Sequence, residues 1–472
     1  MMIYNLNKFN KSNINLNIMS YSIKLFFYLV VYLVSLSAFS QRSNPNVTKG
    51  EFHPITIHNK KLDSLVRHYR NKTENYLIKT KYLHSLYAID SNGIKIYPTS
   101  YHKKKDRPEF SLTWEEVEVF EKLIKYAERD FAYDIFTNKR NDPLSPMVNS
   151  IVKILEENHS QPLPNRPDKP FTGLRIAIDP GHTAGNFQTA KIEQRYTKIF
   201  YENKWYEFAE GILTLATANI LKDSLIKYGA EVFVTRTKPN TNVNGQTYQQ
   251  WLKHRLPQIL RNQGLNEMQI QKKIKTTPAE FFFEYYSNED LDNRATKINA
   301  FKPHFTVVIH YNVDGNNKGW QSHTEKNYSM TFVPGAYMQG ELNSPRDRYD
   351  FVRTLITNHF EESVILSGHI QEAFEKQLKV PAVTEEDNPY YIKNSCLKVK
   401  EGIYARNLRL CRLLNTPVCY GEPLLQDNCF ELVALGQHNE KTGTISPRVI
   451  EVANAYFQGI IKYADYLKRK KK

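Results

Sequence analysis

Cysteine is scarce in this sequence, and the spacing of the few cysteines narrows their possible roles. Four are present among 472 residues, and all four lie in the C-terminal quarter: Cys396, Cys411, Cys419 and Cys429. No two of them have the CxxC spacing of a zinc knuckle, so a site of that kind is excluded. They can pair as disulfides in three ways or remain buried free thiols, and the spacing favours neither.

Long apolar runs are also rare. One of them, residues 25–39 (LFFYLVVYLVSLSAF), is shorter than the roughly 20 residues that a membrane span requires. Lys24 precedes it, and Ala38-Phe39-Ser40 ends it with a cleavage pattern typical of a secretory signal. No cysteine is near enough to this site for lipid attachment. We therefore interpret residues 1–40 as an N-terminal extension and signal peptide, with an uncleaved anchor as the alternative.

The sequence has no acidic excess. Lys and Arg number 64 against 49 Asp and Glu, so the formal net charge is +15, and 41% of the residues are apolar. This composition is typical of a folded protein, and its charge attracts polyanions or simply aids solubility. The signal peptide predicts an exported protein of the periplasm or cell envelope. We therefore expect no nucleic-acid partner, and membrane contact only through the signal segment.

A Pro-rich linker at residues 161–172 divides the remaining chain. Before it, residues 41–160 have apolar side chains at helical spacing, most clearly over residues 61–88, 113–131 and 147–157. Ser111 or Thr113 is a candidate cap for the second of these helices. We predict a small mainly helical domain here, and the sequence does not indicate its function.

After the linker, short apolar strands alternate with amphipathic helices. Residues 174–178, 231–235, 305–309 and 417–420 are the expected strands, and residues 210–228, 363–378 and 452–467 the expected helices. This alternation predicts an α/β domain at residues 173–468, with a mostly parallel sheet flanked by helices on both faces.

Residues that can carry chemistry follow three of these strands or begin a helix. His182, His310 and Glu422 each come directly after or at the end of an expected strand, and Glu210 begins the first helix. Ligands of such sheets bind just beyond the carboxyl ends of the strands. Two imidazoles and one carboxylate form the three-ligand pattern of catalytic zinc, and a further carboxylate is needed for proton transfer. Taken singly, each residue also has an ordinary structural explanation.

Four blocks of sequence resolve this ambiguity. They are IAIDPGH, which ends at His182, EGILTLATANILKDSLIKYGAEVFVTR, RATKINAFKPHFTVVIHYN and TPVCYGEPLLQDN. In this order they resemble the zinc-dependent N-acetylmuramoyl-L-alanine amidases of the amidase-3 family. The resemblance implies that His182, Glu210 and His310 bind Zn²⁺ and that Glu422 is the catalytic acid and base.

The implied reaction is a step of peptidoglycan breakdown. Zinc-activated water would cleave the amide between N-acetylmuramic acid and L-alanine of the stem peptide, with peptidoglycan as the partner. Two alternatives stay open. One is a zinc peptidase that cuts another amide of the wall, and the other is a non-catalytic wall-binding protein with the same fold.

The chain departs from the family pattern in three places. Leu424-Leu425 replace the usual Gly-Phe pair, which affects the expected shape of the substrate groove. Insertions occupy residues 183–209, where we predict a hairpin near the metal, and residues 237–293, where we predict helices at residues 249–256 and 278–286. In some family members an inserted helix covers the site until an activator protein displaces it. An activator that acts on the second insertion is therefore a hypothesis, with passive decoration as the alternative.

Further residues near the expected site have possible roles. Asp179 would either orient His182 through a hydrogen bond or form a turn at the strand end. Asn312 occupies the family's Asn position, and Arg294 would contact acidic peptide groups or form a structural ion pair. His304 lies an even number of residues before His310 but outside the apolar run, so we do not expect it to bind metal.

Overall fold

The computed structural model describes residues 59–137, 146–159, 166–276, 278–315, 317, 322–387, 389–438 and 442–470. The predicted signal peptide and the first part of the Pro-rich linker lie outside these residues. The chain from Asn59 onward forms one compact unit. Among the helices of the described residues, none combines the length and apolar character that crossing a membrane requires.

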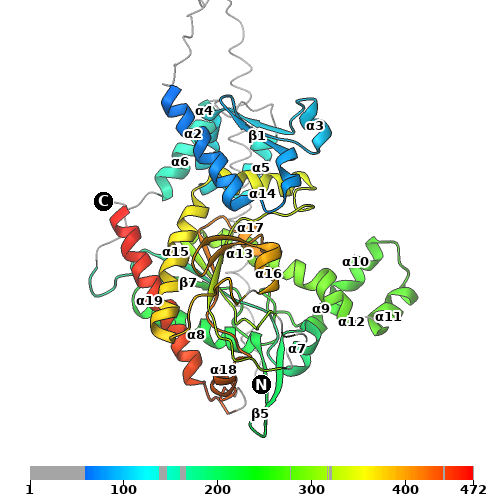
Figure 1. Ribbon diagram of the computed structural model, residues 1–472. Coiled ribbons are helices and arrows are strands. Elements are labelled where there is room, and N and C mark those ends of the chain that lie inside the picture. Colours follow the sequence, from blue (N-terminus) through cyan, green and yellow to red (C-terminus); the bar gives the residue numbers. More distant parts are fainter. Residues whose placement is uncertain are drawn as a thin grey trace, which may run out of the picture. The chain divides into compact units, whose positions relative to one another are not determined.

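A seven-stranded sheet is the centre of the fold (Figure 1). Its strands lie in the order β10-β11-β9-β12-β8-β4-β7, and neighbours are parallel except at β10–β11 and β9–β12. The mostly parallel sheet predicted from the sequence is therefore confirmed. The strands are β4 (Arg175–Pro180), β7 (Glu231–Val234), β8 (Phe305–Ile309), β9 (Met330–Val333), β10 (Leu397–Lys400), β11 (Ile403–Ala405) and β12 (Val418–Glu422).

Helices cover both faces of this sheet, as predicted. On one face, α8 (Glu210–Lys227), α15 (His359–Ala373) and α19 (Pro447–Lys470) lie side by side, and on the other lie α13 (Ser287–Phe301) and α17 (Arg409–Leu413) (Figure 1). Ile176 and Ile178 of β4 pack with the first group, whereas Ala177 packs with the second. This alternation arises because successive side chains of a strand point to opposite faces.

The region before the linker is mainly helical but also contains a three-stranded antiparallel sheet. The side chain of Thr113 accepts a hydrogen bond from Glu116 N at 3.3 Å, and Glu116 Oε2 accepts one from Thr113 N at 2.7 Å, which caps α4. The helix expected over residues 61–88 is wrong after Leu77, because Ile78 is extended and residues 81–86 form a 3₁₀-helix. β1 then begins at Tyr87 and pairs with β2. The elements are α2 (Asn59–Lys72), β1 (Tyr87–Asp90), β2 (Gly93–Ile96), α3 (Ser100–Lys104), β3 (Phe110–Leu112), α4 (Trp114–Tyr126), α5 (Arg129–Thr137) and α6 (Pro146–His159).

This N-terminal region shares a hydrophobic core with the α/β part of the chain. Phe120 and Leu123 of α4 belong to the same buried cluster as Leu355 of α14 (Pro345–Ile356). Arg129 also donates two hydrogen bonds, of 3.1 and 2.7 Å, to the Asp350 carboxylate. The helical region therefore supports the side of the sheet that carries β9 and β11. Its division from the catalytic domain at residues 161–172 stays a prediction.

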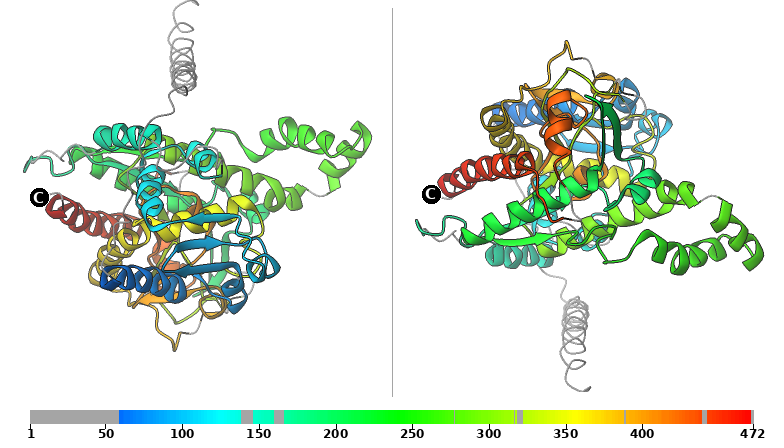
Figure 2. Two further views of the ribbon diagram at one scale, coloured as in Figure 1. Left: turned by 90° about the horizontal axis from the view of Figure 1, so that it is seen from above. Right: turned by 90° about the horizontal axis from the view of Figure 1, so that it is seen from below.

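The two insertions have separate structures. The first contains α7 (Phe187–Glu193) and the predicted hairpin, formed by β5 (Tyr196–Tyr201) and β6 (Lys204–Ala209). The second forms a helical arm that projects to one side in both views of Figure 2 and has its own apolar core. The arm consists of α9 (Tyr248–His254), α10 (Leu256–Asn262), α11 (Glu267–Thr276) and α12 (Pro278–Phe281), followed by a π-helical turn at Phe282–Tyr286.

Candidate metal centre

The turn after β4 presents the first candidate ligand, His182. A Cβ atom at Gly181 would lie 2.3 Å from Nε2 of His310, so the close approach of these segments requires glycine at this position. His182 itself has a φ angle of 62°, which residues other than glycine rarely adopt. Arg294 stabilises this conformation by donating to the carbonyls of Pro180 and His182 at 3.0 and 2.9 Å.

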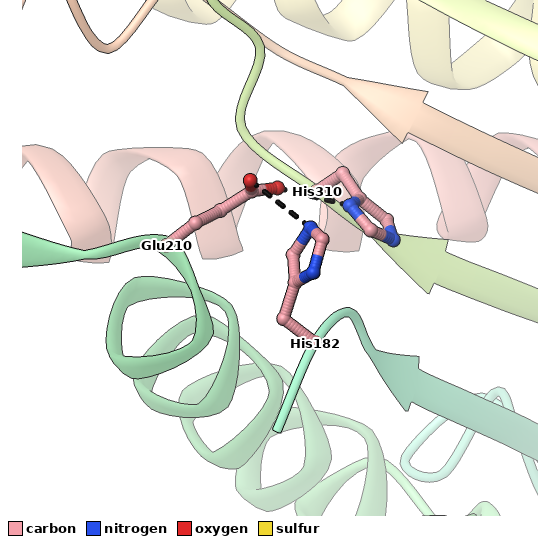
Figure 3. Close-up of side chains that lie close together, drawn as sticks. All are labelled: His182, Glu210 and His310. Carbon is pink, nitrogen blue, oxygen red and sulfur yellow. Dashed lines mark hydrogen bonds and ion pairs between the residues drawn. The ribbon is translucent and has the colours of Figure 1, made fainter. Parts of the chain in front are cut away.

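The three predicted metal ligands converge on one point (Figure 3). Oε2 of Glu210 lies 3.0 Å from Nε2 of His182, and Oε1 of Glu210 lies 2.9 Å from Nδ1 of His310. One donor atom of each residue lies within 4.8 Å of the other two. The backbone N–H of Tyr311 also donates to Oε1 of Glu210 at 3.0 Å, which fixes the carboxylate. The turn after β4, the start of α8 and the end of β8 thus meet at the same edge of the sheet.

The electrostatics of this group suit a cation. Burial favours a neutral Glu210, but His182 and His310 outweigh it and hold the pKa of Glu210 well below its usual range. Burial lowers the pKa of His182, but the Glu210 and Glu193 carboxylates outweigh it and raise that pKa to about 9. The pKa of His310 is lowered, chiefly by burial. Buried carboxylates therefore dominate this site and favour a positive charge between the imidazoles.

Glu193, from the first insertion, contacts the opposite nitrogen of His182. Its Oε1 lies 3.0 Å from Nδ1 of His182, and its carboxylate accepts hydrogen bonds from the backbone N–H groups of Thr183 and Ala184. An Nδ1–H that donates to Glu193 leaves Nε2 free to bind a metal. Glu193 could not be identified from the sequence, because the first insertion lies outside the four blocks that resemble the amidase-3 family. The N-cap residue Asn186 is the local sequence signal for the short helix that carries it.

Asp179 does not have the role of orienting His182 that we considered from the sequence. Its carboxylate accepts from Thr235 Oγ1, in a short contact, and from Nη1 of Arg294 at 3.3 Å. Arg294 is 2% exposed and also pairs with Asp290 at 2.8 Å. Arg294 is thus buried in an ion-pair network, which fits the alternative interpretation of the sequence. Because Arg294 also lines the cavity beside the imidazoles, its contact with acidic peptide groups stays a prediction.

Glu422 ends β12, the strand next to β8. The backbone N–H of His310 donates to the Gly421 carbonyl at 3.0 Å, which places Glu422 beside the metal ligands. Its Oε2 is buried and has no hydrogen-bond partner among the described residues. Burial raises the pKa of Glu422 well above its usual range, and the nearby Glu210 carboxylate raises it further. A buried carboxylate oxygen without a partner is costly unless a cation or water compensates it, so this geometry fits a metal at the site.

Tyr420, two residues before Glu422, fixes the ring of His310. Its hydroxyl lies 2.6 Å from Nε2 of His310, and the two rings stack with centroids 4.4 Å apart. The spacing of two residues places both side chains on one face of β12, which is a signal that the sequence offered. Asn312 does not reach the three ligands, because its side chain donates to the Tyr391 hydroxyl at 2.6 Å.

A cavity of about 160 Å³ opens beside the imidazoles. Glu193 and Tyr420 line it together with His182 and His310, and Phe282, in the turn that ends the helical arm, and Ser287, the first residue of α13, form part of its wall. The second insertion is therefore adjacent to the candidate centre, whereas its response to an activator stays a prediction. His304 is at the other end of β8, where its Nδ1 accepts from Arg175 N at 3.0 Å, in agreement with its exclusion as a ligand.

The chain was compared with curated proteins, solved structures and family profiles. A search of curated proteins found no match. Among solved structures, the chain is similar to the amidase CwlD of Clostridioides difficile, solved with the lipoprotein GerS (17% identity, 62% of this chain and 100% of that one, TM-score 0.35). It is also similar to the N-acetylmuramyl-L-alanine amidase Ami1 of Mycobacterium smegmatis (14% identity, 63% and 99%, TM-score 0.35).

The sequence profile of a known family decides the assignment. The profile described as N-acetylmuramoyl-L-alanine amidase matches residues 176–438, which is more than half of the chain. The match includes His182, Glu210, His310 and Glu422. The chain therefore belongs to the N-acetylmuramoyl-L-alanine amidase family, a family of peptidoglycan hydrolases.

Proposed function

We propose that this protein is a zinc-dependent amidase that separates the stem peptide of peptidoglycan from its glycan strand. The bond cleaved is the amide between N-acetylmuramic acid and L-alanine. The proposal rests on one observation: donor atoms of His182, Glu210 and His310 lie close together around one point, and Glu422 ends β12, the strand next to β8.

The donor set fits zinc. Two imidazole nitrogens and one carboxylate, with a position left for water, are typical of catalytic zinc sites. The chemistry that Zn²⁺ supplies when bound is polarisation of the substrate carbonyl and acidification of water. His182 would bind through Nε2 and His310 through Nδ1, since these nitrogens face Glu210.

The remaining residues of the site position groups and move protons. Glu422 accepts the proton of the attacking water and returns it to the departing amine of L-alanine. Glu193 keeps the proton of His182 on Nδ1, and Tyr420 fixes the ring of His310. Phe282 brings the end of the helical arm to the wall of the cavity, where an activator that shifts the arm would alter access.

We also propose that the protein acts outside the cytoplasm. Peptidoglycan lies there, and the segment at residues 25–39 has the pattern of a secretory signal. The net charge of +15 would favour association with anionic wall polymers. Signal cleavage in the native host, followed by detection of the mature protein in envelope fractions, tests this location.

Digestion of purified peptidoglycan sacculi tests the proposed reaction. We expect wild-type protein to yield peptide-free glycan together with intact stem peptides, as identified by mass spectrometry, and H182A to yield neither. A shortened peptide still attached to sugar would favour a zinc peptidase instead. Zinc-loaded protein that releases nothing, even with candidate activators, would favour a wall-binding protein without catalytic activity.

A further inference from the structure

A second group of metal-binding side chains lies outside the amidase centre. His323 and Glu325 are in the segment between β8 and β9, and Cys429 is the first residue of α18 (Cys429–Leu435). One donor atom of each lies within 4.8 Å of the other two, and Sγ of Cys429 lies 3.1 Å from Oε1 of Glu325. We propose that these three side chains bind a second divalent transition-metal cation of the zinc class, in a site that is structural and not catalytic.

The types of donor atom determine which cation would bind. A thiolate disfavours Ca²⁺ and Mg²⁺, which prefer oxygen, whereas a thiolate, an imidazole and a carboxylate together suit Zn²⁺ or Co²⁺. Around tetrahedral zinc, bond lengths of about 2.0–2.3 Å place ligand atoms roughly 3.3–3.8 Å apart. The 3.1 Å contact between Cys429 and Glu325 is close to this separation, so small side-chain shifts would complete the site.

The backbone of the two ligand-bearing segments is already fixed. Cys429 N donates to the Thr324 carbonyl at 3.1 Å, and Thr324 N donates to the Asp427 carbonyl at 2.9 Å. The Asn428 side chain caps α18 and also donates to the Lys326 carbonyl at 3.1 Å. These bonds hold Glu325 next to Cys429, so binding would require little ordering of the backbone.

A residue of the first insertion contacts His323, the third proposed ligand. The ring of Tyr201, at the tip of the β5–β6 hairpin, packs against His323 with centroids 5.0 Å apart. A cation at this site would therefore secure the segment after β8 and the start of α18 beside the hairpin. His323 and Glu325 are exposed and Cys429 is buried beneath them, so a cation can enter from solvent.

Cobalt substitution tests the site independently of amidase activity. The test uses the H182A variant, in which the amidase centre lacks a ligand, kept reduced and loaded with Co²⁺. We expect near-ultraviolet absorption from thiolate-to-cobalt charge transfer, with about one equivalent of cobalt bound. Adding C429S should abolish the absorption, whereas C419A, which alters a cysteine buried in the sheet, should leave it unchanged.

Two surface substitutions address the other ligands without disturbing the core. In the H182A background, H323A and E325Q should each weaken cobalt binding by roughly tenfold or more. Removing a residue that only orients a metal ligand typically costs about tenfold in affinity, and removing a ligand should cost at least as much. Absence of the thiolate band, or binding unaffected by C429S, would overturn the proposal. A band in the H182A variant, together with wild-type protein that proves unable to cleave peptidoglycan, would contradict the proposed amidase function and leave this site established.

Discussion

Oε1 of Glu193 lies 3.0 Å from Nδ1 of His182, on the side of the imidazole opposite the nitrogen that faces Glu210. Glu193 is largely shielded from solvent, since it is only 6% exposed. Its carboxylate also accepts hydrogen bonds from two backbone N–H groups. A helix within an insertion thus supplies the carboxylate that accepts a hydrogen bond from His182, a candidate metal ligand.

Replacement of Glu193 should weaken metal binding. E193Q removes the charge that favours the Nδ1–H tautomer, so we expect Zn²⁺ affinity to fall by about 10- to 100-fold. Competition with a chromophoric chelator measures this change. E207Q alters an exposed carboxylate of the same insertion, paired with Lys198, and should bind zinc as wild type does. Equal affinities for E193Q and E207Q would show that Glu193 does not orient His182.

Replacement of Glu422 should separate metal binding from turnover. Glu422 is not one of the three converging ligands, so E422Q should retain zinc while kcat falls by roughly 10²- to 10⁴-fold through loss of proton transfer. Metal analysis and release of stem peptides from sacculi measure the two quantities. E401Q, a surface control whose carboxylate pairs with Lys398, should keep full activity. Loss of zinc from E422Q would mean that Glu422 is a ligand instead.

Removal of zinc should lower both activity and stability. Because the ligands come from three separate elements, the cation stabilises only the folded chain, by about 2.7 kcal/mol when free zinc is 100 times its Kd. Chelation should abolish peptide release, and added zinc should restore it together with the higher Tm. In the C429S background the proposed second metal site lacks a ligand, so the change in Tm reports on the amidase centre alone. A Tm that is indifferent to zinc in that background would contradict the expected coupling.

Loss of Arg294 should destabilise the turn that carries His182. R294A would leave Asp179 and Asp290 buried without their partner, which typically costs about 3–5 kcal/mol. Urea unfolding measures this loss. R409A removes a more exposed pair with Asp292 and should cost no more than about 1 kcal/mol. Similar losses for the two variants would argue against a buried network around Arg294.

The N-terminal helices should unfold together with the catalytic domain. Leu123 is fully buried in the shared core, so L123A should cost about 2–5 kcal/mol. Circular dichroism and loss of peptide release during urea unfolding should then follow the same transition, shifted to lower urea. A separate early transition that leaves the amidase active would show that the N-terminal region folds on its own.

Much of the fold was predictable because its signals are local. The strand at residues 305–309 is predicted correctly because four apolar residues and Thr306 form a short run that precedes a polar group, and all five are buried. The helix that begins at Glu210 was identified from its apolar spacing and the glycine after it. The roles of His182, Glu210, His310 and Glu422 could be predicted because each residue lies at a strand end or helix start within a block that resembles the amidase-3 family.

What escaped prediction depends on contacts between distant segments. Glu193 is unremarkable in sequence, and only the packing of α7 against the turn after β4 brings it to His182. Asp179 was considered for that role because it is close in sequence, yet Thr235 and Arg294 bind it instead. The core shared by Leu123 and Leu355 joins residues more than 200 positions apart, which apolar spacing alone cannot reveal.

Anomalous scattering at the zinc edge, from crystals of the zinc-loaded protein, directly tests whether His182, Glu210 and His310 bind zinc. We expect a strong peak about 2.0–2.2 Å from Nε2 of His182, the Glu210 carboxylate and Nδ1 of His310. Active, zinc-loaded crystals with no peak between these three side chains would contradict this expectation.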